Sequence, residues 1–132
     1  MEIKDLSLCF HTTKGAECKE FYQKYFGAVV TFDYEWYSVV AFGDKKQFTL
    51  SFMIPQDNES LFEDKGLTLN FHVDNVDNEY QRLIVAQGLK AIRPLADNPW
   101  GDRSFTILDP LGNVLYIYSE IKPTEEFAAA YK

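Results

Sequence analysis

The sequence is poor in cysteine and in positive charge, and each shortage argues against a class of protein. It has two cysteines, Cys9 and Cys18, in 132 residues. Small secreted domains held by disulfides usually carry more, so a reduced, cytoplasmic setting is the simpler interpretation. There are 20 acidic residues against 13 lysines and arginines, which gives a net charge of -7, and no basic run occurs. Nucleic-acid binding needs a positive surface, so the composition argues against it.

Long apolar segments and familiar catalytic motifs are also missing. No stretch approaches the roughly 20 apolar residues needed to cross a bilayer, so no membrane partner is expected. The first residues, Met1 to Asp5, do not open a signal peptide, because no basic segment precedes a long apolar run. No serine-histidine-acid set, glycine-rich phosphate loop or paired-carboxylate motif is present. The sequence therefore names no nucleophile and no general base.

The first half is predicted to run as a strand, a helix and three strands. Residues Ile3 to Phe10 alternate, which would place Leu6, Leu8 and Phe10 on one face of a strand. A helix with Thr12 or Thr13 as its N-cap follows, and Gly27 would end it. The next three segments are rich in β-branched and aromatic residues, and they are Val29 to Tyr34, Tyr37 to Phe42 and Phe48 to Ile54.

The same pattern restarts after a polar, acidic linker at residues 55–66. A strand at 67–73 leads to a helix that Asp74 or Asn75 would cap and that Gly88 would end. A short strand at 90–94, a hairpin and a C-terminal helix complete the half. Corresponding elements recur at nearly constant spacing, which indicates a weak internal duplication. We therefore expect one domain built of repeat one (1–54), the linker, repeat two (67–119) and a tail (120–132).

The stretch from Asn98 to Tyr118 is predicted to form a loop, a strand, a tight turn and a second strand. In the turn, Asp109 to Asn113, the proline and the glycine favour a hairpin. The preceding loop holds Trp100 between a proline and a glycine. In one interpretation, Trp100 and the charged side chains of Asp102 and Arg103 form part of a binding site, since rigidly held loops often carry binding groups. In the other, Trp100 plugs the end of the sheet and Arg103 pairs with Asp102.

The duplication and three motifs point to a known superfamily. The segments Phe21 to Gly27, Pro99 to Phe105 and Asp109 to Asn113, in this order, resemble the glyoxalase / bleomycin-resistance / extradiol-dioxygenase superfamily. The resemblance covers nearly the whole chain, and the Pro99 to Arg103 element looks most like the bleomycin-resistance branch. It implies an α+β fold in which two βαβββ repeats form curved mixed sheets around a cleft. It also implies a homodimer that either holds a divalent metal in the cleft or sequesters a ligand there.

The resemblance also says where a metal would be held. Metal-dependent relatives place one ligand on the first strand and one on the last strand of each half, usually histidine or glutamate. The corresponding positions here are Ser7, Thr68 and Tyr116, with a fourth at Thr49, Leu50 or Ser51. None of these is a histidine or a carboxylate. No metal or other cofactor is therefore expected, and glyoxalase I or dioxygenase activity is not favoured.

A displaced metal site is the alternative. Cys9 and His11 share a predicted face with Ser7, while His72 shares one with Thr68. If these faces met, the three side chains would support a metal-dependent lyase or dioxygenase-like enzyme. The competing interpretation is a small buried cysteine and two ordinary polar histidines near strand ends. Side-chain alternation does not choose between the two.

The residues expected along the cleft are mostly aromatic. The candidates for ligand binding are Trp36, Phe48, Phe52, Asn70, His72, Trp100, Arg103, Tyr116 and Tyr118. Such a lining suits a planar or amphipathic molecule, and a cation would gain from the rings and from the acidic surface. The sequence thus predicts metal-independent binding or sequestration of a small aromatic or cationic molecule in the cleft of a homodimer.

Overall fold

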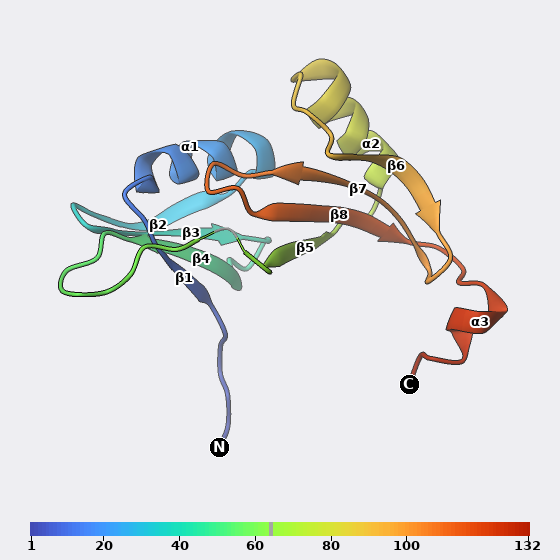
Figure 1. Cartoon of the computed structure of the whole chain (residues 1–132), viewed down its shortest axis with the longest axis horizontal. Coiled ribbons are helices and arrows are strands. Elements are labelled where there is room, and N and C mark those ends of the chain that lie inside the picture. The colour runs from blue at the N-terminus through green and yellow to red at the C-terminus, as the bar shows by residue number, and fades with distance from the viewer. Residues whose placement is uncertain (64) are drawn as a thin grey trace. The chain divides into compact units, whose positions relative to one another are not determined.

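The chain divides into two compact units, Met1–Asp64 and Lys65–Lys132. The computed structural model describes residues 1–63 and 65–132, so Asp64 of the predicted linker lies outside the described residues. Each unit contains a four-stranded mixed sheet with helix packed against it (Figure 1). The α+β fold of two βαβββ repeats is confirmed. That the two sheets enclose a cleft stays a prediction.

The first unit has the strand order β1-β4-β3-β2. Its elements are β1 (Leu8–His11), α1 (Gly15–Phe26), β2 (Val29–Tyr34), β3 (Tyr37–Phe42) and β4 (Phe48–Met53). The first strand runs parallel to β4, and the other neighbours are antiparallel. The α1 helix covers one face of this sheet (Figure 1).

Aromatic side chains fill the space between α1 and its sheet. Tyr22 is fully buried, and its ring stacks on Phe52 with centroids 6.2 Å apart and meets Phe42 edge-on at 5.6 Å. Phe10 stacks on Phe52 from the neighbouring strand at 6.1 Å. Such pairs add to the free energy of burying apolar surface. Phe52, which the sequence suggested as a cleft wall, is only 2% exposed and belongs to this core.

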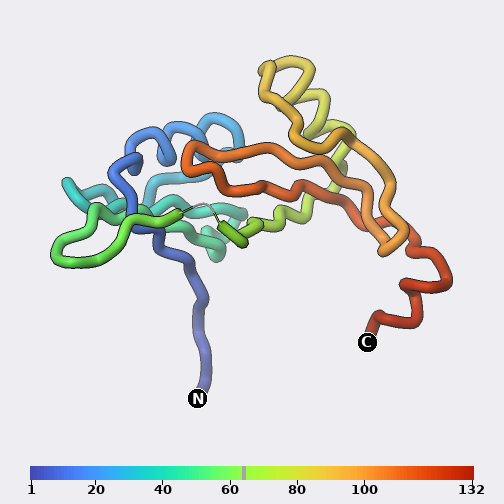
Figure 2. The backbone as a smooth tube through the Cα atoms, viewed as in Figure 1, coloured from blue at the N-terminus to red at the C-terminus, as the bar shows by residue number. Residues whose placement is uncertain are grey.

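The first strand is shorter than the sequence predicts. It begins at Leu8, opposite Leu50 of β4, and residues 1–7 lead into it as an extended segment (Figure 2). Leu6 is 85% exposed. The predicted strand from Ile3 is wrong because residues before Leu8 have no ladder partner in the sheet. Alternation of apolar residues does not by itself supply one.

The ends of α1 agree with the prediction on one side only. The N-cap residue is Lys14, not Thr12 or Thr13, and no side chain caps the helix. Thr12 Oγ1 instead accepts a hydrogen bond from Lys14 N at 2.9 Å and shapes the preceding turn. At the other end Gly27 ends the helix as predicted, with φ of 63° and its N–H bonded to Tyr22 O.

The second unit repeats the strand order of the first, as β5-β8-β7-β6. Its elements are β5 (Thr68–His72), α2 (Val76–Tyr80), the π-helix η1 (Gln81–Ala86), β6 (Arg93–Asn98), β7 (Asp102–Leu108), β8 (Val114–Glu120) and α3 (Glu125–Ala128). The pair β5 and β8 is parallel, like β1 and β4. This shared order bears out the internal duplication.

The helical segment of the second unit packs on β7 and β8. Asn75 caps α2 as predicted, since its side chain accepts a hydrogen bond from Asn78 N at 3.0 Å. The helix then widens into η1, a change the sequence pattern does not predict. Leu83 is 1% exposed, and Tyr80 meets Phe105 edge-on at 5.2 Å. The α2 and η1 segment therefore covers this face of the sheet.

The β6–β7 hairpin corrects another prediction. The strand expected at 90–94 lies at Arg93–Asn98, and β7 begins at Asp102, directly after a short turn. Gly101, with φ of 115°, donates its N–H to Asn98 O at 3.2 Å and closes the turn. Asn98 and Asp102 have low β-propensity, so the sequence does not predict that they pair. They pair because the turn between them brings the two strands together. The Pro99 to Gly101 segment is thus a hairpin turn rather than a long loop.

Candidate functional site

Three rows of side chains cross the face of the second sheet that lies opposite α2. Directly opposed residues share a face, so the strand register defines each row. The rows are Arg93-Thr106-Tyr116-Asn70, Ala96-Ser104-Tyr118-His72 and Asn98-Asp102-Glu120. The alternate residues, among them Phe105, Ile107 and Leu115, are buried on the helix side. A polar and aromatic face thus lies over an apolar core.

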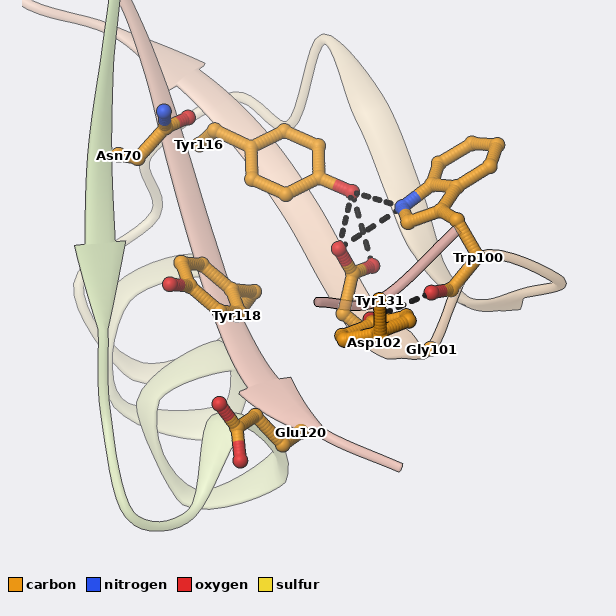
Figure 3. A pocket seen from close by; sticks show the side chains of 8 residues that line it. All are labelled: Asn70, Trp100, Gly101, Asp102, Tyr116, Tyr118, Glu120 and Tyr131. Atoms are coloured by element: carbon orange, nitrogen blue, oxygen red, sulfur yellow. Dashed lines mark hydrogen bonds between the residues drawn. The ribbon is translucent and has the colours of Figure 1, made fainter. Parts of the chain in front are cut away.

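A pocket of about 500 Å³ opens on this face (Figure 3). Its rings are those of Trp100, Tyr116, Tyr118 and Tyr131, and its polar side chains are Asn70, Asp102 and Glu120. Among the described lining residues there is no lysine, arginine or histidine. The pocket therefore combines aromatic surface with two carboxylates.

Asp102 is the centre of the hydrogen bonding in this pocket. It is 9% exposed. Its carboxylate accepts from Trp100 Nε1 at 2.8 Å, from the Tyr116 hydroxyl at 2.8 and 3.0 Å and from Asn98 Nδ2 at 2.8 Å. In Figure 3 the indole nitrogen and the phenol oxygen both point at this carboxylate. All three donors are neutral, so they orient the carboxylate without cancelling its charge.

Tyr116 stays a neutral hydrogen-bond donor. Burial raises the pKa of its phenol above the ordinary value, and the neighbouring Asp102 raises it further, while a hydrogen bond from Ser104 works in the opposite direction. A phenol with a raised pKa keeps its proton at neutral pH. Tyr116 therefore holds Asp102 in place and presents its ring to the pocket.

The C-terminal segment contacts Trp100 and fixes its position. The Tyr131 hydroxyl donates to Trp100 O at 2.7 Å, and Phe127 of α3 meets the indole edge-on at 6.3 Å. Thr124 N donates to Pro99 O at 2.9 Å. These contacts tie the tail to the β6–β7 turn, so that Tyr131 forms one side of the pocket (Figure 3).

Arg103 lies on the opposite side of the sheet from Trp100 and Asp102. Its guanidinium bonds Asp77 of α2 at 3.1 Å and Asp97 of β6 at 2.9 Å. The bonds to Arg103 lower the pKa of Asp77, and the bonds to Asp77 and Asp97 raise the pKa of Arg103. The pairing with Asp102, which one of the two interpretations of the sequence included, is therefore wrong, because adjacent residues of a strand point to opposite faces. The structure does not bring Arg103 together with Trp100.

The other candidates from repeat two lie on the pocket side. Asn70 and Tyr118 line the pocket. His72 lies opposite Tyr118, and the two rings stack with centroids 5.0 Å apart and planes 12° apart. The structure thus brings together Asn70, Trp100, Tyr116 and Tyr118, with His72 at their edge.

The candidates from repeat one belong to the first unit. Trp36 and Phe52 line a smaller pocket of about 180 Å³, next to the start of α1. Trp36 is 40% exposed and Phe48 is 62% exposed. Phe48 does not line that pocket. Within the first unit these three residues therefore do not form one wall.

The family's metal positions can be tested against the donors present. Tyr116 is a neutral phenol bonded to Asp102, and Thr68 is two residues from Asn70 on β5. In the first unit Ser7 precedes β1, and Ser51 Oγ donates to Leu8 O at 3.4 Å. A phenol and aliphatic hydroxyls are poor ligands for a divalent transition metal beside water. The side chains at these four positions are therefore not suited to bind a divalent metal ion.

The displaced site divides between the two units. Cys9 and His11 lie on β1, and His72 lies on β5. Within either unit, no three side chains of histidine, cysteine, aspartate or glutamate among the described residues form a group that could hold a metal. The convergence of Cys9, His11 and His72 stays a prediction.

Sequence reasoning missed several members of the pocket. The sequence places Asp102 on the Trp100 to Arg103 loop as a charge at the rim of a site or as a partner for Arg103, but it does not indicate the central hydrogen-bonding role of this carboxylate, and it does not point to Tyr131. Glu120 follows Tyr116 and Tyr118 at the same period of two, so extending that alternation by one step would have found it. No comparable signal marks Tyr131, because its place depends on how the tail folds back.

Comparison with known proteins places the fold. None of the helices in the described parts of the chain is long and apolar enough to cross a membrane. Among proteins with curated descriptions, no sequence matches this chain significantly. Solved structures do match, and at the identities given below the likeness shows the fold alone.

Three of these structures illustrate the likeness. A glyoxalase/bleomycin resistance protein/dioxygenase from Nocardioides is 19% identical with a TM-score of 0.72, covering 92% of this chain and 86% of that one. A virulence protein from Salmonella typhimurium is 18% identical with a TM-score of 0.71, covering 92% and 100%. A member of the glyoxalase/bleomycin resistance protein/dioxygenase superfamily from Sphaerobacter thermophilus is 18% identical with a TM-score of 0.70, covering 90% and 98%.

A family profile covers most of the sequence. The profile described as a Glyoxalase-like domain matches residues 8–122, from the first strand to just beyond the last. The matching region includes both repeats and the Asp109 to Asn113 hairpin turn. The chain therefore belongs to the Glyoxalase-like domain family, within the glyoxalase/bleomycin resistance/dioxygenase superfamily.

Proposed function

We propose that this protein binds and sequesters a small aromatic cation, without a metal, in the pocket of the second unit. This keeps the bleomycin-resistance-like function expected from the sequence and assigns it to one set of residues. The homodimer expected from the resemblance stays part of this proposal. No residue of the pocket is assigned to covalent chemistry.

One observation carries the proposal: Asp102 is a nearly buried carboxylate whose bonded partners are all neutral. No ion pair to Asp102 is present among the described residues. Buried charges in proteins are usually paired with an opposite charge or with a metal. A cation in the pocket would supply the missing charge, and Glu120 at the rim would add to its attraction.

The aromatic side chains favour a flat ligand. Trp100, Tyr116 and Tyr118 present ring surface to the pocket, and the Tyr116 and Tyr118 rings lie 5.9 Å apart at 46°. A planar ring placed against them buries its apolar surface away from water, and its positive charge is attracted to the faces of the aromatic rings. Asn70 offers an amide that can fix the orientation of the ligand. Affinity then comes from ring burial, and selectivity for a cation comes from the carboxylates.

A matched pair of probes tests the proposal. 1-Methylquinolinium is a permanent cation, and 2-methylquinoline is nearly the same size but neutral at pH 8. A ligand that binds the native state raises the unfolding temperature as its concentration rises. We expect 1-methylquinolinium to raise it in a concentration-dependent way and 2-methylquinoline to raise it much less. Equal shifts, or no shift with either compound, would contradict the proposal.

A further inference from the structure

We propose that a second hollow beside the pocket binds an anionic group, so that the ligand is a zwitterion with an aromatic cation at one end and a carboxylate at the other. The inference rests on the proposed function, because the cationic end occupies the pocket described above. The hollow has a volume of about 210 Å³ and lies on the same face of the second sheet.

The side chains of this hollow differ in charge from those of the pocket. Its polar residues are Arg93, Asn98, Ser104, Thr106 and Tyr116. No carboxylate is among its described lining residues, whereas Asp102 and Glu120 line the neighbouring pocket. The two sites thus carry opposite charge on one continuous face.

Arg93 is the group that would hold the anion. The other arginines of the chain are engaged: Arg82 pairs with Glu79, and Arg103 pairs with Asp77 and Asp97. No ion pair involving Arg93 is found among the described residues. Its guanidinium presents several N–H donors in a planar fork, which matches the two oxygens of a carboxylate.

Thr106 adds a second donor at the same point. Arg93 and Thr106 are directly opposed in the sheet, and Thr106 Oγ1 accepts a hydrogen bond from Arg93 N at 3.0 Å. A hydroxyl that accepts one bond still carries a hydrogen to donate. Thr106 lines the hollow, so its hydroxyl is placed to donate that hydrogen to a group that enters it.

The two sites meet at Tyr116, which lines both. Its row contains Arg93 and Thr106, and its hydroxyl reaches Asp102 at 2.8 Å. Asp102 and Thr106 are four positions apart on β7, which corresponds to about 13 Å along an extended strand. A ligand that satisfies both ends therefore carries its charges well apart, with its middle over Tyr116.

Titration calorimetry with a small set of compounds tests the inference. The probes are 1-methylquinolinium, a quinolinium with an N-linked carboxypentyl chain, the primary amide of that compound, and a quinolinium with a carboxymethyl group. We expect the carboxypentyl acid to bind about fivefold more tightly than its amide, as for one partly exposed ion pair. The carboxymethyl acid should bind more weakly than 1-methylquinolinium, because its charge lies against Asp102 and Glu120.

Variants assign the effect to Arg93. Arg93→Gln should make the carboxypentyl acid and its amide bind equally. Arg82→Gln, on the helix, should leave the fivefold difference intact. If 1-methylquinolinium binds the native protein but the acid and amide bind equally, the inference is overturned and the proposed function stands. If 1-methylquinolinium does not bind at all, the proposed function is wrong, and the inference that rests on it is wrong as well.

Discussion

The Tyr116 hydroxyl donates to both oxygens of Asp102, at 2.8 and 3.0 Å, although the two residues are not opposite each other in the sheet. Tyr116 lies opposite Thr106, and Asp102 lies opposite Glu120. The ring of Tyr116 therefore leans along the sheet to reach the carboxylate. This diagonal contact fixes the acidic side chain at the centre of the pocket and sets one wall of it.

Removing this hydroxyl should weaken the fold. Tyr116→Phe deletes a donor to a nearly buried carboxylate, and we expect a loss of about 1–2 kcal/mol in the free energy of unfolding. Tyr118→Phe is the matched control, since no hydrogen bond of the Tyr118 hydroxyl is found among the described residues. Urea unfolding of both variants measures the difference. An equal loss in the two variants would show that the contact with Asp102 contributes nothing.

The same contact predicts how stability depends on alkaline pH. Burial raises the pKa of Tyr116 in the folded state above the ordinary value of 10.0. The stabilisation is therefore complete below about pH 10 and is lost as the pH rises through the folded pKa, where the unfolded state has already released its proton. The stability advantage of the native protein over Tyr116→Phe should shrink above that pH. A difference that stays constant up to the alkaline limit of folding would contradict the raised pKa.

Glu120 should contribute charge attraction without being needed for the fold, since its side chain is exposed. We expect Glu120→Gln to weaken 1-methylquinolinium binding about threefold to fivefold at low salt and to leave binding of the neutral quinoline unchanged. Glu35→Gln removes the same charge from a turn of the first unit and serves as the control. Calorimetric titration of both variants distinguishes a local effect from one of net charge, which would weaken binding equally in the two.

Gly101 should be sensitive to substitution because it has φ of 115° and contacts the tail. A Cβ at this position would lie 2.6 Å from the Tyr131 hydroxyl oxygen. We expect Gly101→Ala to cost about 1–3 kcal/mol, more than Gly66→Ala, where φ is 75° but nothing lies within 4 Å of the added atom. Adding Tyr131→Phe should recover part of the loss. Urea unfolding of the single and double variants measures this, and strictly additive losses would exclude the clash.

The two-repeat fold could be predicted because several local signals agree with one another. Gly27 ends α1, Asn75 caps α2, and the Asp109 carboxylate accepts from Leu111 N and Asn113 N at 2.9 Å each to shape the hairpin turn. Each of these depends on a few neighbouring residues. Strand register and strand ends depend on partners that are distant in sequence. For this reason the predicted bounds of β1 and β6 differ from those in the structure.

Only the part of the candidate site that follows from the alternation of side chains along strands could be predicted from the sequence. Alternation placed Asn70, Tyr116 and Tyr118 on one face, and the structure brings them to one pocket. The role of Asp102 depends on donors from a turn and from a neighbouring strand, and Tyr131 depends on the path of the tail. Arg103 shows the converse, because nearness in sequence to Trp100 suggested a shared site while the pleat of the strand separates them.

The central claim is that an aromatic cation binds against Trp100 and Asp102, and the indole N–H signals in an NMR spectrum test it most directly. The chain has two tryptophans, Trp36 and Trp100, so two such signals are expected, and Trp100→Phe assigns them. On titration with 1-methylquinolinium, the Trp100 signal should move, because its N–H is bonded to Asp102 at 2.8 Å, while the Trp36 signal stays in place. Saturable binding that leaves the Trp100 signal unmoved, or that moves only the Trp36 signal, would contradict the account.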